Sequence, residues 1–165
     1  MAFTKTTLQY VTGLTVTEIL AANAASLGDK TVQHTAFNKT ARMDSTTTPP
    51  VSLVAAFQQA LDGGAATIDL AALVGTNGAT VDATGKKVQA VKFANPSTND
   101  NAITVAVGAA NGYDLSGAAF SITLQPGQEF VYFGNDATPD VAAGDKTLDL
   151  AGTLAQALDC IIVLG

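Results

Sequence analysis

Apolar and polar side chains alternate along much of the chain, in short runs separated by Gly, Asn, Pro and Asp. One such run, residues 66–71 (ATIDLA), is nearly repeated at residues 146–151 (KTLDLA). Alternation with a period of two is typical of a strand that buries one face and exposes the other. Both runs are therefore predicted to be half-buried strands, with Asp69 and Asp149 on the outward face.

The same period predicts further strands through the second half of the chain. They are expected at residues 65–71, 79–83, 87–94, 102–107, 118–124, 128–133, 145–151 and 155–164. Short strands at this spacing, divided by turn signals such as Asn77-Gly78 and Asn111-Gly112, indicate an antiparallel sandwich or barrel. We predict a mainly β chain whose main domain is an antiparallel β-sandwich, jelly-roll-like in character.

Two of these runs also indicate which side chains form the core. The expected core faces carry Phe120, Ile122 and Leu124 in one run and Val88, Ala90 and Phe93, with their neighbours, in the other. Between the runs 118–124 and 128–133, the segment 125–128 (QPGQ) predicts a tight turn. Gly127 is expected to supply the positive φ that a type II turn requires.

The first 50 residues follow a different pattern. The segment 15–18 (TVTE) has capping-box spacing, and good helix formers follow it up to Gly28, so one short helix is expected there. Residues 31–40 alternate weakly and are expected to form an edge strand or an extended arm. The loop 44–50 (DSTTTPP) then separates an N-terminal arm, residues 1–50, from a sandwich domain, residues 51–165. Residues 51–61 fit either a helix or a strand, and we favour a strand.

Composition and charge narrow the classes of partner. Of the 165 residues, 47% are hydrophobic and only 13% are charged, with a net charge of −6. This charge argues against binding to nucleic acid or to an anionic membrane surface. The basic pair Lys86-Lys87 is expected at a solvated strand edge. No run approaches the ~20 apolar residues of a membrane span, and the N-terminus lacks the pattern of a secretion signal, so folding in a reducing cytosol is expected.

Residues suited to nucleophilic or metal chemistry are few. The single cysteine, Cys160, lies in an apolar terminal run and is expected to be a buried free thiol. The single histidine, His34, has no second histidine with which to share a metal, and an exposed or edge-strand position is expected. Neither a nucleophile elbow nor a phosphate-binding loop occurs in the sequence. We therefore expect no catalytic, cofactor-binding or metal-binding residues, and no enzyme.

The acidic residues leave two alternatives open. The loop oxygens of Asn99, Asp100 and Asn101, or those of Asn135, Asp136 and Asp140, are of the kind that binds calcium. Neither group matches a 12-residue calcium loop, so turn formation is the favoured interpretation. Asp69 and Asp149 are expected either to be solvated or to present equivalent faces of their strands to a partner.

Three segments resemble small virion proteins of tailed bacteriophages. They are residues 88–97 (VQAVKFANPS), residues 102–113 with the runs AITV and GAANGY, and residues 146–153 (KTLDLAGT). The resemblance lies in style and motif order over residues 65–165. It implies a β-sandwich subunit of the virion, with capsid decoration or cementing as the leading role.

The resemblance also implies the partners of such a subunit. Decoration proteins of this kind clamp neighbouring major-capsid subunits, bind by shape, are frequently homo-oligomers and use an N-terminal arm to reach a neighbour. We accordingly expect a non-enzymatic capsid protein, assembled in the host cytoplasm, that needs residues 1–30 for attachment. The alternatives are another virion component, such as a tail, head-fibre or receptor-facing module, and a carbohydrate-binding sandwich. The last has only Tyr10, Tyr113 and Tyr132, with no Trp, to stack on a sugar ring.

Overall fold

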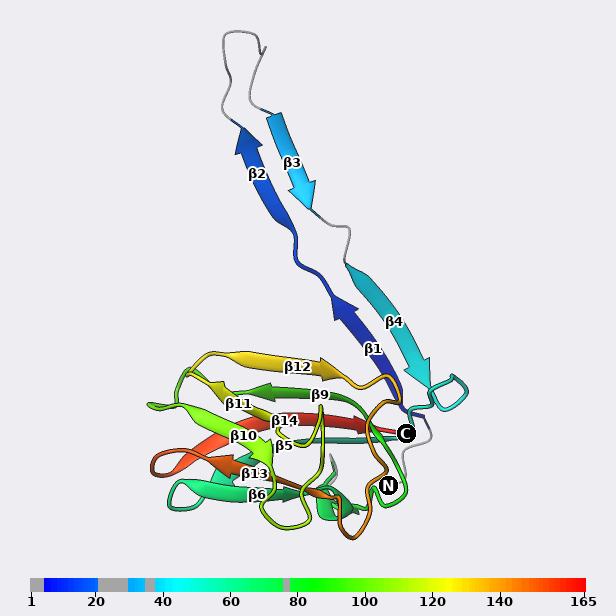
Figure 1. Cartoon of the computed structure of the whole chain (residues 1–165), viewed down its shortest axis with the longest axis vertical. Coiled ribbons are helices and arrows are strands. Elements are labelled where there is room, and N and C mark those ends of the chain that lie inside the picture. Colours follow the sequence, from blue (N-terminus) through cyan, green and yellow to red (C-terminus); the bar gives the residue numbers. More distant parts are fainter. Residues whose placement is uncertain (1–4, 21–29, 35–37, 76–77) are drawn as a thin grey trace. The chain divides into compact units, whose positions relative to one another are not determined.

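The computed structural model describes residues 5–20, 30–34, 38–75 and 78–165, and it is mainly β with antiparallel sheets (Figure 1). The prediction of a mainly β, antiparallel chain is confirmed. In these residues the one helical segment is the 3₁₀ turn η1 (Leu70–Ala72). The strands are β1 (Thr7–Thr12), β2 (Val16–Leu20), β3 (Lys30–His34), β4 (Lys39–Asp44), β5 (Leu53–Leu61), β6 (Ala65–Asp69), β7 (Leu73–Val74), β8 (Thr80–Val81), β9 (Val88–Ala94), β10 (Ile103–Val107), β11 (Ser121–Leu124), β12 (Glu129–Phe133), β13 (Thr147–Ala151) and β14 (Gln156–Leu164).

Two four-stranded antiparallel sheets hold most of these strands (Figure 1). One sheet, called sheet C, has the order β12-β9-β14-β5, and the other, called sheet D, has the order β11-β10-β13-β6. The remaining strands form three two-stranded ribbons, β1-β4, β2-β3 and β7-β8. Neighbours along each sheet are mostly distant in sequence, so the sheets form only when long-range pairing has occurred.

Both sheets contribute to one hydrophobic core. Sheet C supplies Phe93, Leu158 and Ile162, and sheet D supplies Ile103, Val105, Leu148 and Leu150, all at most 2% exposed. The largest fully buried side chain, Tyr113, comes from the loop between β10 and β11. Burial of apolar side chains from two sheets against each other is the arrangement of a sandwich-like fold.

The predicted strands correspond closely to the observed ones after residue 50. The prediction of a strand at residues 51–61 is confirmed by β5. The strand expected at 65–71 ends earlier, at Asp69, because the Asp69 side chain accepts a hydrogen bond from the Ala71 backbone and begins η1. The turn at 125–128 forms as predicted: Gly127 has φ of 81°, and the Gln128 N–H donates to the Gln125 carbonyl at 2.9 Å.

One predicted core face needs a correction. Val88, Ala90 and Phe93 were expected to share it, but Ala90 packs in a separate cluster on the opposite side of β9. The cause is a bulge, since Leu164 pairs with Val88 while the preceding Val163 pairs with Ala90. The extra residue changes the alternation, so that Val88, Val91 and Phe93 face the main core.

The predicted N-terminal helix is wrong over residues 16–20. These residues form β2, which pairs with β3 in the register Val16 to His34 and Ile19 to Thr31. Val, Thr and Ile are β-branched and favour strands, and a cross-strand partner satisfies the backbone groups that a helix would have paired internally. The rest of the predicted helix, residues 21–27, lies outside the described residues.

Contacts divide the chain into two compact units. The body consists of residues 1–8 and 43–165, and the arm consists of residues 9–42. Within the body, Leu8 and Met43 pack with Val51, Ala90 and Val163 in the cluster on the outer face of sheet C. Short segments before the arm and after it therefore belong to the body.

Candidate functional site

The two near-repeated segments are neighbouring strands. β6 and β13 pair antiparallel, with Ile68 opposite Leu148, Thr67 opposite Asp149 and Asp69 opposite Thr147. Ile68 and Leu148 are buried in the core, whereas Thr67 is exposed and Asp149 half-buried on the outer face. The repeat thus creates a local two-fold pattern in which each Thr lies across from the Asp of the other copy.

Both carboxylates of this pattern have structural partners. Asp149 accepts hydrogen bonds from the Thr67 hydroxyl at 2.8 Å and from the Ala109 backbone at 2.7 Å. Asp69 accepts from the Ala71 backbone at 2.9 Å and forms an ion pair with Lys146 at 2.8 Å. Because each oxygen of each carboxylate has a partner, the pair holds β6, β13 and the adjoining loops in place.

The outer face of sheet D is built from small side chains. Pairing between β11, β10, β13 and β6 places these residues in two rows across the sheet. The first row is Thr123, Thr104, Ala151 and Ala65, and the second is Ser121, Ala106, Asp149 and Thr67. The Thr104 and Thr123 hydroxyls are 2.8 Å apart and hydrogen-bonded. A face with no large side chain at these eight positions is flat and polar, with one charged group.

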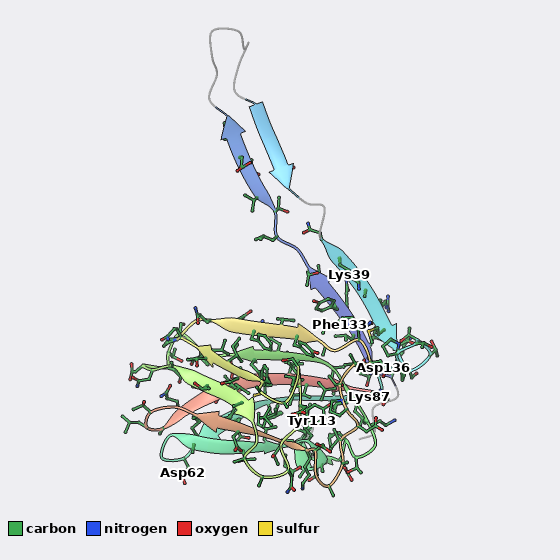
Figure 2. All side chains as sticks on the ribbon, in the orientation of Figure 1. Lys39, Asp62, Lys87, Tyr113, Phe133 and Asp136 are labelled. Carbon is green, nitrogen blue, oxygen red and sulfur yellow. The ribbon has the colours of Figure 1, made fainter. Side chains whose placement is uncertain are left out.

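In the candidate calcium group of Asn135, Asp136 and Asp140, Asp136 is paired with a lysine. The Lys87 ammonium lies 3.1 Å from the Asp136 carbonyl oxygen and 3.6 Å from its carboxylate. Figure 2 labels both residues. The buried Gln89 accepts a hydrogen bond from the Asp136 backbone at 3.1 Å. The Lys87 ammonium therefore balances the charge of the Asp136 carboxylate, and Gln89 holds the backbone of the loop that follows β12.

In the candidate calcium group of Asn99, Asp100 and Asn101, the asparagines belong to an amide network. The Asn99 side-chain amide donates to the Asn95 side-chain oxygen and to the Ala157 carbonyl, both at 2.7 Å. The buried Asn95 donates in turn to the carbonyls of Asn101 and Leu124. Among the described residues, no group of three or more His, Cys, Asp or Glu side chains has a metal-binding arrangement.

The remaining candidate residues divide between core and arm. Cys160 is a buried free thiol, and burial raises its pKa to about 12. Tyr113 is buried, and Tyr132 packs against the core with its ring nearly parallel to that of Phe130, at 6.5 Å between centroids. The buried ring of Tyr113 is not accessible to a sugar. His34 lies in β3 opposite Val16.

The outer face of sheet C differs from that of sheet D. A row across β12, β9, β14 and β5 consists of Val131, Lys92, Ile161 and Ala56, and Val131 and Ile161 are 51% and 43% exposed. The next row carries Glu129 and Asp159, and Lys92 forms an ion pair with Glu129 at 2.9 Å. A shallow hollow of about 300 Å³ lies over these residues. This face combines exposed apolar side chains with an acidic border.

The arm exposes most of its side chains. Among those that the structure describes, Tyr10 and Ala41 are half-buried and the others are exposed. Four large apolar ones are prominent: Val11, Leu14, Val16 and Ile19 are 60%, 78%, 44% and 66% exposed. A two-stranded ribbon is marginally stable by itself in water, and these side chains give the arm a large exposed apolar surface.

Comparison with known proteins gives no match, whether with family models, curated proteins or solved structures. Within the described residues, no helix has the length and apolar character needed to cross a membrane. The candidate functional features are therefore three surfaces: the outer faces of sheets C and D and the apolar side chains of the arm.

Proposed function

We propose that this protein is a non-enzymatic virion structural protein, a capsid decoration protein that binds the outside of a phage shell and stabilises it by protein–protein contacts. The exposed apolar side chains of the arm carry the proposal. Leu14, in the segment between β1 and β2, and Ile19, in β2, are more than half exposed in an arm that has little core of its own. Such side chains are costly in water and favour burial against another protein.

The strand order of the body also supports this function. Numbered one to eight along the chain, β5, β6, β9, β10, β11, β12, β13 and β14 form sheets in the orders 6-3-8-1 and 5-4-7-2. We interpret this order as two interleaved Greek keys, which is the jelly roll found in viral capsid proteins, lectins and cupins. The fold alone leaves those functions open, and the arm favours assembly.

The polar residues of the body fit a role in assembly. Asp69, Asp149 and Asp136 are each tied to a lysine, a hydroxyl or backbone groups, and Cys160 is buried. The flat, small-residue face of sheet D offers a second surface for a shell protein. We propose attachment at several points, in the host cytoplasm where the particle assembles, with the major capsid protein as partner.

The test is binding to isolated phage shells, measured by co-sedimentation and by cryo-electron microscopy of the pelleted particles. We expect regularly spaced density on the shell with the wild-type chain. Leu14→Asp should reduce the bound amount at least about tenfold, because it places a charge at a buried contact. Thr40→Asp, an exposed polar position of the arm on β4, is the matched control and should bind normally.

Density on a tail or fibre instead of the shell would support the alternative that the protein is another virion component. Normal shell binding by Leu14→Asp would contradict the role of the arm. Absence of binding by the wild-type chain to any part of the particle would overturn the proposed function as a whole.

A further inference from the structure

The distribution of charge between the two units favours contact between copies of this chain. The arm, residues 9–42, contains three basic and two acidic residues, whereas the body contains five basic and twelve acidic residues. The arm therefore carries a net charge of +1 and the body −7. Opposite net charges attract an arm to the body of another copy, while two bodies repel each other.

The outer face of sheet C is the part of the body best suited to receive an arm. Val131 and Ile161 lie on either side of Lys92 in one row, and Glu129 and Asp159 border that row with two carboxylates. The apolar pair can bury hydrophobic side chains. Glu129 already pairs with Lys92 at 2.9 Å and Asp159 accepts from Gln58 at 2.9 Å, so a basic side chain of the arm would share these carboxylates. Sheet D lacks an exposed apolar pair of this kind, because its outer rows hold small residues together with the bonded carboxylates of Asp69 and Asp149.

Part of the same face is already covered by side chains of β1 and β4, the two strands that continue into the arm. The row of Phe133, Ala90, Val163 and Val54 is packed under Leu8 of β1 and Met43 of β4, together with Val51. The exposed row of Val131 and Ile161 is the next one along the sheet. A ribbon laid on this row would extend the covered apolar surface without a break.

We infer that the arm of one copy docks on the outer face of sheet C of a second copy, with Ile19 and its apolar neighbours against Val131 and Ile161. This inference rests on the proposed assembly function and names a partner for the arm. Each copy offers one arm and one face, so the contact is head-to-tail and generates a ring if it closes or a chain if it does not. Linked copies would bind a shell at several points, so the same contact accounts for the weaker attachment expected when the arm is disabled.

The experiment uses two full-length variants and their mixture. Ile19→Asp disables the arm, and Val131→Asp, on the edge strand β12, disables the face. Sedimentation velocity should give a wild-type mass above that of one chain and a mass near one chain for each variant, with self-association weakened at least about tenfold. An equimolar mixture should give a one-to-one dimer and nothing larger, because only one intact arm and one intact face remain.

Two controls test the positions and the fold. Thr40→Asp, an exposed position of the arm on β4, and Ser121→Asp on edge strand β11 of sheet D should associate like the wild type. Circular dichroism melting shows whether each variant is folded, and Ile161→Lys replaces Val131→Asp if that variant is not. Raising the salt concentration should weaken association, because the attraction is partly electrostatic.

A wild-type chain that is monomeric at every concentration tested would overturn the inference, and so would a mixture of the two variants that stays monomeric. A monomer that still covers phage shells would leave the proposed function intact, so the two failures are distinguishable. Oligomers that are disrupted by Ile19→Asp but unaffected by both Val131→Asp and Ile161→Lys would place the arm on another surface and would also overturn the inference.

Discussion

Thr67 of β6 donates a 2.8 Å hydrogen bond to Asp149 of β13, across the pair of strands formed by the near-repeated segments. The equivalent pair, Thr147 and Asp69, lies in the same register, but its members bond elsewhere. The Thr147 hydroxyl donates to the Asn111 carbonyl at 3.0 Å, and Asp69 pairs with Lys146. The repeated sequence therefore builds one pattern of strand pairing and two different polar environments.

This relationship predicts that Thr67 and Asp149 are energetically coupled. Asp149→Ala should lower the free energy of unfolding by about 1–2 kcal/mol, because it leaves the Ala109 N–H and the Thr67 hydroxyl without this acceptor. Thr67→Val should cost about 0.5 kcal/mol, and a double-mutant cycle in urea should give coupling of about 0.5–1 kcal/mol. Asp159→Ala, exposed on β14, is the control and should change stability little. Additive effects of the two substitutions would contradict the coupling.

The hydroxyl of Tyr113 joins two segments inside the body. It donates to the Pro139 carbonyl at 2.8 Å and accepts from the Val88 N–H at 3.1 Å, and burial raises the pKa of the phenol. Tyr113→Phe leaves both backbone groups unpaired at a buried site, so we expect a loss of about 1–3 kcal/mol in urea unfolding. Tyr132→Phe keeps its ring packing and should cost under about 0.5 kcal/mol. Equal effects of the two substitutions would contradict the prediction.

Adjacent glycines in the turn between β5 and β6 should differ in their tolerance of alanine. Both have positive φ, 59° at Gly63 and 91° at Gly64, but only at Gly64 does an added Cβ meet a backbone atom, the Gly152 carbonyl oxygen at 2.7 Å. Gly63→Ala should cost about 1–2 kcal/mol from the left-handed backbone alone. Gly64→Ala should cost at least about 1 kcal/mol more, because the backbone must also shift. Thermal melting of both variants compares them, and equal losses would disprove the close contact.

Because the Cys160 thiol is buried, we expect the free energy of unfolding to fall at high pH. Its ordinary pKa of 9.0 applies in the unfolded chain, whereas burial raises it to about 12 in the folded body. Between these two values the folded state holds a proton that the unfolded state has lost, so the free energy of unfolding decreases as pH rises from about 9 to about 12. Each pH unit in this window costs up to about 1.4 kcal/mol.

Urea unfolding at a series of pH values measures this slope, and Cys160→Ala is the comparison. The variant should have lower stability near pH 7, where its smaller side chain leaves a cavity, but a shallower decline above pH 9. The native thiol should also react with a thiol reagent at pH 8 only as fast as the body opens. Parallel pH profiles or rapid labelling of the native chain would each count against a buried thiol.

Strand positions after residue 50 were predictable because each strand buries one face. In β13, Leu148 and Leu150 alternate with Thr147, Asp149 and Ala151, and this local pattern predicts a strand whatever its neighbours are. The turn at Pro126-Gly127 was equally local, since a positive φ at one position requires glycine or a near substitute.

Errors arose where pairing with distant residues overrode the local signal. The capping-box pattern at 15–18 predicted a helix, but β2 gains a cross-strand partner in β3, which a local reading of the sequence does not include. Alternation places Ala90 on the same face as Val88, and the bulge between β9 and β14 puts it on the opposite face. Pairing and bulges depend on two strands at once.

By itself, the sequence determined the mainly β character, most strand positions after residue 50 and the small number of groups suited to chemistry, because periodicity, turn residues and composition are properties of short segments. Only the tertiary structure decided that the two near-repeats are partners, that Lys87 lies against Asp136, and that Val131 and Ile161 share an exposed row. Each of these relationships joins residues more than 25 positions apart, so it exists only once the sheets have assembled.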